Sequence, residues 1–201
     1  MTKLGPITLK RYQGKEPFHE NGHPLGCDLL SFWQWSSSDL LGNITRGIMA
    51  EYLVANAIGI AGGVREEWAT YDLETPEGLK LEVKSASYVQ RWQQAKLSQI
   101  SFRVPKTRGW DPRTGQLSSL PQRQADVYVF ALLAHTEQAS LDPLDVSQWQ
   151  FYVLPTFILD NRRRSQHSIT LPSLQKLAGG YVSYSGLKKA IGEAAKAVTR
   201  R

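Results

Sequence analysis

Three charged side chains around one tight turn, Asp72, Glu82 and Lys84, could perform hydrolytic chemistry together. The turn is Thr75-Pro76-Glu77-Gly78, with proline where a fixed φ suits a type I turn and glycine where a positive φ is needed. This pattern predicts a three-residue hairpin loop with Thr75 opposite Leu79. In that register Asp72 lies directly across from Glu82, with their Cβ atoms about 5 Å apart. Strand alternation then places Lys84 on the same face.

Such a constellation suits phosphodiester hydrolysis. Two facing carboxylates repel each other unless a cation lies between them. Magnesium is typically held by one or two carboxylates together with water and substrate phosphate. A lysine beside the ion can orient or deprotonate the attacking water and offset charge that develops on the phosphate. The opposite face of the hairpin is apolar and is expected to pack beneath a helix; it carries Tyr71, Leu73, Leu81 and Val83.

The same residues also permit a plainer interpretation. An exposed hairpin often has a charged outer face, and Glu74 opposite Lys80 would then be a cross-strand ion pair without catalytic meaning. The hairpin taken by itself does not decide between these two interpretations.

A predicted helix upstream supports the catalytic interpretation. Residues 43–58 have helical periodicity, with Asn43 as a candidate cap and Gly59 as a terminator. Glu51 lies within the apolar stripe of this helix, where a carboxylate is costly unless it is paired or bound to a metal. Alternatively, Glu51 lies at the edge of the stripe or pairs with Arg46 or a backbone amide. The stripe consists of Ile44, Ile48, Ala55 and Ile58.

This arrangement resembles the PD-(D/E)XK nuclease superfamily: a helix glutamate, a strand aspartate and the run Glu82-Val83-Lys84 on the partner strand. The resemblance covers about residues 43–134 and implies a restriction-endonuclease-like fold, a central mixed β-sheet flanked by helices. It further implies that Asp72, Glu82, the Val83 carbonyl and Glu51 bind Mg²⁺, or Mn²⁺ in its place, while Lys84 serves the attacking water. Tyr71 stands where the proline of the family motif would be, which removes no ligand.

The remaining pattern also predicts an α/β protein. Residues 125–134 are almost wholly apolar, as in a strand buried on both faces. Strands are further expected at 100–104 and 149–159, a short helix at 89–97, and a terminal helix striped by Leu187, Ile191, Ala194 and Val198. We expect one domain over 1–201, with an irregular N-terminal extension (1–42), a nuclease-like core (43–160) and a C-terminal helical extension (161–201). Trp33 and Trp35 are expected to dock the N-terminal extension onto the core.

Candidate substrate contacts follow Lys84 in the chain. Hydroxyl, amide and basic groups suit phosphate and base contacts; the candidates are Ser85, Ser87, Gln99, Ser101, Arg103, Lys106 and Arg108. Arg113 and Arg123 add positive charge to the same loop-like stretch. The alternatives are a solvated helix over 89–97 and a mobile solvated loop after it.

Composition is compatible with a nucleic-acid partner. The chain has 24 basic and 18 acidic residues, for a formal charge of +6, which favours an anionic partner without fixing the fold. Cys27 is the single cysteine, which excludes an intrachain disulfide, and no signal-peptide-like or membrane-spanning apolar run is present. We therefore expect a cytoplasmic protein that contacts no membrane.

The leading hypothesis is a metal-dependent nuclease that hydrolyses DNA through attack of a metal-activated water. A homodimer would fit, because cutting both strands needs two centres, but the sequence decides neither this nor DNA against RNA. One alternative is a catalytically idle nucleic-acid-binding module of the same fold. Another is a glycosidase-like hydrolase with paired carboxylates, in which Lys84 would have no obvious role.

Overall fold

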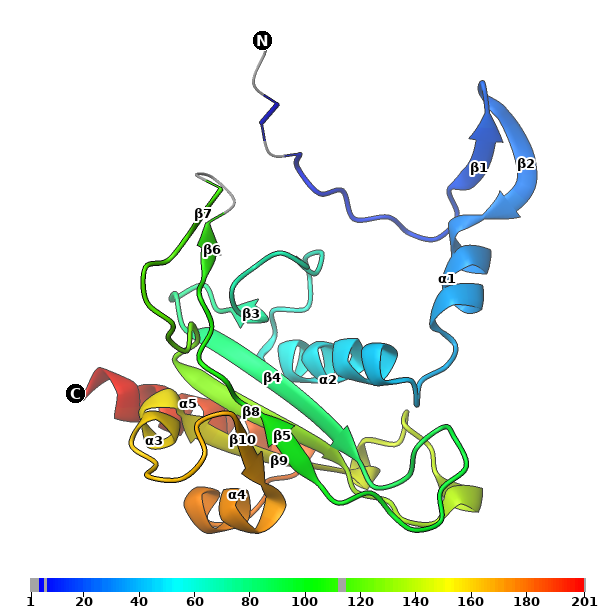
Figure 1. The fold of residues 1–201 in the computed structure, drawn as a ribbon. Helices are drawn as coiled ribbons and strands as arrows, with labels where there is room; N and C mark the ends of the chain where they lie inside the picture. The colour runs from blue at the N-terminus through cyan, green and yellow to red at the C-terminus, as the bar shows by residue number, and fades with distance from the viewer. Residues whose placement is uncertain (1–3, 6, 112–114, 201) are drawn as a thin grey trace.

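The protein is built on a four-stranded mixed sheet with strand order β3-β4-β8-β9 (Figure 1). The computed structural model describes residues 4–5, 7–111 and 115–200. Strands β3 and β4 are antiparallel, β4 and β8 are parallel, and β8 and β9 are antiparallel. The strand bounds are Leu73–Glu74 for β3, Lys80–Ser87 for β4, Val127–Leu133 for β8 and Trp149–Pro155 for β9. The expected mixed central sheet is therefore confirmed.

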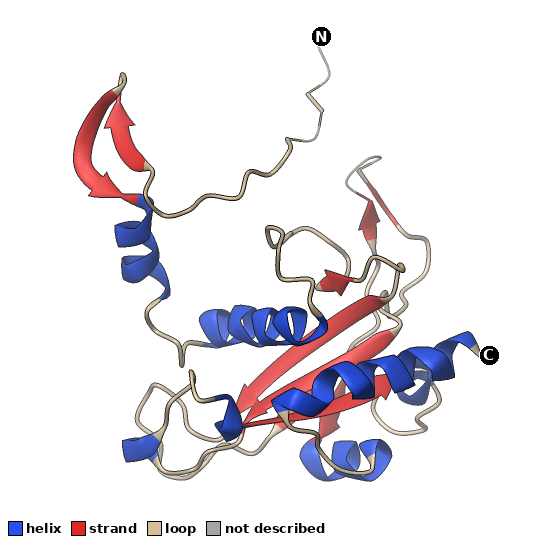
Figure 2. Cartoon of the chain, turned by 180° about the vertical axis from the view of Figure 1, so that it is seen from behind, coloured by secondary structure: helices blue, strands red, loops and turns tan. Residues whose placement is uncertain are grey.

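Helices and short strands cover both faces of this sheet (Figures 1 and 2). On one face lie α2 (Asn43–Ile58) and α5 (Leu187–Thr199). On the other lie α4 (Leu171–Ala178) and a two-stranded sheet of β5 (Ser101–Arg103) and β10 (Ser168–Thr170). Every residue of β8 is buried because this strand lies between the two layers, as its continuous apolar run predicts.

The remaining short elements connect these layers. Helix α3 (Thr156–Asp160) directly follows β9, so the apolar run that was expected to be one strand to residue 159 is part strand and part helix. The terminal helix is confirmed, with Leu187, Ile191 and Ala194 buried along α5. Three 3₁₀ turns complete the described elements: η1 (Gln138–Ser140), η2 (Val146–Gln148) and η3 (Tyr184–Gly186). No helix among the described residues is both long enough and apolar enough to cross a bilayer.

Helix α2 has the predicted bounds, but its buried face overlaps the predicted stripe only in part. It ends at Gly59, whose φ of 83° lies in the left-handed region that glycine adopts without strain. Ile44 is 80% exposed and Ile48 is 41% exposed, whereas Ala55 is buried and Ile58 packs against the core, so only the C-terminal half of the predicted apolar stripe faces the core. The buried residues are Arg46, Ala50, Glu51, Val54 and Ala55. The stripe prediction was wrong for Ile44 and Ile48, of which Ile48 lines a surface cavity described below.

The hairpin of β3 and β4 has the predicted register. Leu73 pairs with Leu81 and Glu74 with Lys80, and the Thr75 N–H donates to the Leu79 carbonyl at 3.0 Å. Gly78 has the positive φ, 83°, that the turn requires. Three of the four apolar side chains predicted to face a helix do pack against α2, namely Leu73, Leu81 and Val83, whereas Tyr71 packs against the core on the other face.

The N-terminal extension has more regular structure than its sequence suggests. Strands β1 (Pro17–Glu20) and β2 (His23–Asp28) form a hairpin, and helix α1 (Leu29–Ser37) follows. The turn forms because Asn21 and Gly22 both take positive φ, 50° and 86°. The extension projects away from the sheet (Figure 1). Trp35 is 85% exposed and Trp33 contacts Gly14 of the same extension, so neither provides the expected docking onto the core.

The stretch that follows β4 contains no helix over 89–97. The Gln94 side chain accepts from the Gln90 N–H at 2.6 Å and donates to the Tyr88 carbonyl at 3.2 Å. These side-chain bonds use backbone groups that a helix would need, which explains why the helical prediction was wrong.

After β5 the chain makes a long excursion that carries β6 (Trp110–Asp111) and β7 (Gln116–Leu117). Buried Arg123, at the end of this excursion, connects it to the residues where it starts and to the segment after α3. Its guanidinium donates to the carbonyls of Val104 and Gln166, at 2.7 and 2.8 Å, and to the Asp160 carboxylate at 2.5 Å. The expected contact residue Arg113 lies outside the described residues.

Candidate active site

Asp72 lies directly before β3, at the edge of β4. Its N–H donates to the Leu81 carbonyl at 3.0 Å, and its Oδ2 accepts from the Val83 N–H at 2.7 Å. The paired register ends at Leu73 and Leu81, and Asp72 lies just beyond it, bonded to Leu81 and Val83. The carboxylate thus occupies the place that the next residue of a longer β3 would take.

The same register directs a backbone oxygen toward the site. In a strand, the N–H and C=O of one residue project to the same side. Because the Val83 N–H points to Asp72, the Val83 carbonyl is directed to that edge too, away from β8. The Val83 carbonyl oxygen therefore faces the edge where the Asp72 carboxylate lies, and its role as a ligand, which the resemblance implies, stays a prediction.

Glu82 and Lys84 lie two residues apart on one face of β4, and the Lys84 ammonium makes an ion pair with the Glu82 carboxylate. Their side chains are 18% and 31% exposed, so the pair lies at the boundary between core and solvent. Tyr128 pairs with Glu82 across β4 and β8. Burial, and next the Glu82 charge, raise the pKa of Tyr128, so its hydroxyl stays protonated beside these carboxylates.

The electrostatics of Asp72 are the most perturbed in the site. Burial is the largest cause, and the Glu82 charge the second, of a rise in the pKa of Asp72 to about 7; Glu51 adds to the rise, while the Val83 N–H and Lys84 oppose it. The carboxylates of Asp72 and Glu82 therefore repel each other at close range in a poorly solvated place. Such a pair is stabilised by a cation between its members.

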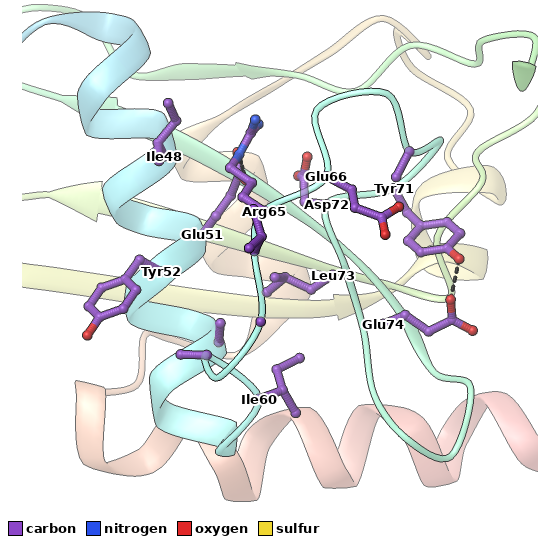
Figure 3. Close-up of a pocket in the computed structure, with 15 residues that line it drawn as sticks. Ile48, Glu51, Tyr52, Ile60, Arg65, Glu66, Tyr71, Asp72, Leu73 and Glu74 are labelled. Carbon is purple, nitrogen blue, oxygen red and sulfur yellow. Dashed lines mark hydrogen bonds and ion pairs between the residues drawn. The ribbon is translucent and has the colours of Figure 1, made fainter. Parts of the chain in front are cut away.

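Arg65 holds the remaining acidic residue. Its guanidinium donates to both oxygens of Glu51, Nε to Oε2 at 2.5 Å and Nη2 to Oε1 at 3.1 Å. The Glu51 side chain is 11% exposed, so its burial on α2 is matched by this bidentate pair, and the predicted alternative partner, Arg46, lies elsewhere. Figure 3 shows Glu51 and Arg65 in contact, with Asp72 beside them.

Glu51, Arg65 and Asp72 line a cavity of about 380 Å³ between α2 and the loop that leads into β3, whereas Glu82 and Lys84 are not part of its lining (Figure 3). Glu51, Arg65 and Asp72 supply its charged wall, and Ile48 and Tyr52 belong to its helical wall. Sequence reasoning missed Arg65 because a loop residue has no periodicity. The pairing could have been suspected only from the need of buried Glu51 for a cation.

The donor set fits one hard divalent cation. Among the residues that the structure describes, no three His, Cys, Asp or Glu side chains gather as a ligand cluster. Glu51 is engaged by Arg65, and Glu82 by Lys84. The set that fits consists of the Asp72 and Glu82 carboxylates with the Val83 carbonyl, all oxygen donors as such cations prefer. Glu51 stands apart as an accessory group.

Two of the three serines predicted to contact nucleic acid, Ser85 and Ser87, are engaged within the protein. Ser85 accepts from Arg46 Nε at 3.2 Å. Ser87 is 1% exposed and donates to the Val89 carbonyl at 2.8 Å, so its hydroxyl does not reach the surface. Arg46 is itself buried, and that burial lowers its pKa.

The other predicted contacts are at the surface. Gln99, Ser101 and Arg103 are exposed at and beside β5, on the side of the sheet that carries Glu82. Lys106 is exposed and lies 3.5 Å from the Asp160 carboxylate. Arg108 is exposed and lines a second cavity. The predicted contact set is therefore divided between buried and accessible positions.

Comparison with known protein families gives one match. The family model described as Bacteriophage T4 endonuclease IV matches residues 29–171, more than two thirds of the chain. The matched region contains all the residues of the site, from Glu51 to Lys84. No curated protein matches the chain.

Proposed function

Because the chain belongs to the bacteriophage T4 endonuclease IV family, we propose that it is a Mg²⁺-dependent endonuclease that hydrolyses phosphodiester bonds of DNA, with a site of the PD-(D/E)XK kind. The observation that carries this proposal is the half-buried Asp72 carboxyl, whose pKa is raised by burial and then by the Glu82 charge, at the edge of the strand that carries the Glu82–Lys84 ion pair. The family name supports endonuclease activity. The metal requirement and the residue roles rest on the geometry of these three side chains.

Asp72, Glu82 and the Val83 carbonyl would hold the cation. Mg²⁺, or Mn²⁺ in its place, supplies Lewis-acid chemistry, activating the attacking water and offsetting the charge of the phosphate. The Val83 N–H keeps one Asp72 oxygen oriented along the strand edge and leaves the other available. The protonated Tyr128 hydroxyl adds no negative charge to the site.

Lys84 serves the nucleophile and the phosphate. It is paired with Glu82 and partly exposed, so its ammonium can exchange that partner for a phosphate oxygen when substrate arrives. A positioned ammonium stabilises charge that develops in the transition state. Glu51, fixed by Arg65 on the α2 side of the cavity, would serve as an accessory group to the cation.

The test is cleavage of supercoiled and linear DNA by the wild type and by Asp72→Asn. We expect cutting in Mg²⁺ or Mn²⁺, none in EDTA, and a loss of at least about a hundredfold in Asp72→Asn. Glu77→Gln is the matched control, because Glu77 is an exposed carboxylate at the tip of the same hairpin. Cutting in EDTA, or an active Asp72→Asn protein, would overturn the proposal. Salt-dependent binding without turnover in any divalent ion would instead identify an idle binding module.

A further inference from the structure

A second cavity, of about 560 Å³, lies beside the first. Its size falls within the range of about 300–1,000 Å³ that is typical of ligand pockets. The loop that leads into β3 forms one wall. The other wall is formed by β6, β7 and the chain segments on either side of them. The residues used below are Glu67, Trp68, Ala69, Arg108, Trp110 and Gln124.

Two tryptophans from distant parts of the sequence meet in this cavity. The rings of Trp68 and Trp110 lie edge to face, with centroids 6.1 Å apart and planes at 61°. Trp68 is nevertheless 76% exposed and Trp110 is 37% exposed, so each keeps much of its ring surface in water. Exposed indole surface gathered in a concave place is typical of a binding site for a flat apolar group.

The polar groups of the cavity suit an amphipathic, anionic ligand. Gln124 contributes a half-buried amide, held by its Nε2 on the Thr107 carbonyl at 3.0 Å. Arg108 is exposed and positively charged, whereas Glu67 is the acidic group of the cavity. A ring that stacks on indole, an edge that bonds an amide or carboxylate, and a phosphate that meets a guanidinium together describe a nucleotide.

The position of the cavity connects it to the candidate active site. Ala69 lines both cavities, so they share a wall. Trp68 precedes Asp72 by four residues on the same loop. A base that stacks on Trp68 and a phosphate at Asp72 would therefore be held by the same loop of the protein.

We propose that the cavity between Trp68 and Trp110 is a nucleobase subsite, in which an unpaired base of the DNA substrate stacks on indole while its phosphate lies at the candidate active site. This inference rests on the proposed function. It assigns to the loop before β3 and to the β6–β7 hairpin a direct part in holding substrate. A base that is paired in a duplex would have to leave its stack to enter this subsite.

The test is binding of fluorescein-labelled single-stranded DNA in EDTA at fixed salt, followed by anisotropy. One strand is oligothymidylate, and the other has the same phosphates but abasic sugars. We expect the wild type to bind the strand with bases more tightly. Trp68→Ala should weaken that binding by about 5- to 150-fold, the range of base–aromatic stacking, and should bind the two strands alike. Trp68→Phe, which keeps a ring, should retain most of the affinity. Trp35→Ala, which removes an exposed tryptophan from α1, should bind like the wild type.

The outcomes separate this subsite from the proposed reaction when cleavage in Mg²⁺ is measured on the same preparations. If the wild type cuts DNA but Trp68→Ala and Trp110→Ala bind both strands as the wild type does, the subsite is overturned and the nuclease stands. If the variants lose base-dependent binding but no preparation cuts with any divalent ion, the subsite stands and the hydrolytic proposal fails. If the wild type binds neither strand, the subsite is overturned, and the cleavage measurement alone decides the nuclease.

Discussion

Arg65 donates hydrogen bonds to both carboxylate oxygens of Glu51, at 2.5 and 3.1 Å, and thereby holds a buried carboxylate of α2 beside Asp72. The Glu51 carboxylate and Asp72 interact unfavourably, as the raised pKa of Asp72 shows, with burial and Glu82 as its larger causes. The guanidinium is thus the resident cation of the cavity. Its removal should leave the acidic side chains to repel one another.

We expect Arg65→Gln to destabilise the metal-free protein by about 1–3 kcal/mol. Breaking a buried ion pair costs about 3–5 kcal/mol, and the figure is reduced here because the Arg65 side chain is 38% exposed. Urea denaturation in EDTA measures the change. Glu51→Gln combined with Arg65→Gln should recover part of the loss, and a double variant no more stable than Arg65→Gln would contradict the pairing as its cause.

Stability of the metal-free protein should fall as pH rises from about 5 to 8. Burial, then Glu82, raise the pKa of Asp72 to about 7 in the folded protein, compared with about 4 in an unfolded chain. Between these values the folded state binds more protons than the unfolded state. The contribution is therefore present at low pH and is lost as pH rises through about 7.

Asp72→Asn should remove this dependence. The free energy of unfolding of the variant, relative to the wild type, should increase by on the order of 3 kcal/mol between pH 5 and 8 in EDTA. Denaturation curves at several pH values measure it. A difference that stays constant over this range would show that Asp72 does not titrate there.

Magnesium should raise the melting temperature, and more at pH 8 than at pH 5. A ligand that binds the folded state stabilises it, and this cation needs Asp72 in its charged form. Differential scanning fluorimetry with a MgCl₂ titration at both pH values measures the shift. Asp72→Asn should show little shift at either pH, whereas Glu77→Gln should respond as the wild type does.

Lys84→Met should lower the rate of DNA cleavage by about 10²–10⁴-fold, the usual range for a group that assists proton transfer, while leaving DNA binding in EDTA nearly unchanged. Single-turnover cleavage measures the rate. Because Lys84 is paired with Glu82, circular dichroism should confirm that the variant is folded. Cleavage at the wild-type rate would remove Lys84 from the chemistry.

Arg103→Ala should reduce the slope of log K against log salt for DNA binding by about 1, as expected for one lost phosphate contact. Arg103 is exposed on β5, on the side of the sheet that carries Glu82. Lys188→Ala makes the same charge change on α5, which covers the other face. Equal slopes for the two variants would show that β5 contacts no phosphate.

Much of the candidate site could be predicted from local rules. The turn around Pro76 and Gly78 determines the hairpin register, which pairs Leu73 with Leu81 and brings Asp72 to the edge of β4. Strand alternation then places Lys84 beside Glu82. These inferences depend on neighbours within a dozen residues, for which backbone geometry is nearly decisive.

The parts that sequence reasoning missed depend on distant contacts. Ile48 faces a cavity rather than the core because a loop seventeen residues further on forms its other wall, at Arg65. Ser85 was expected to face substrate but bonds Arg46, thirty-nine residues earlier. Trp68 and Trp110 meet only because the excursion after β5 folds back over the loop before β3. Periodicity carries no information about such pairings.

The anchoring of Arg123 has a mechanical consequence for the wall that carries Trp110. Arg123 lies on the returning part of the excursion. Its guanidinium donates to Val104, where the excursion departs, and to Asp160 and Gln166. The two ends of the excursion are therefore held together at its base. Trp110 lies beyond these contacts, past the bridge between Thr107 and Gln122. Residues inserted between Lys106 and Gln122 would change how far the excursion extends and leave the sheet intact.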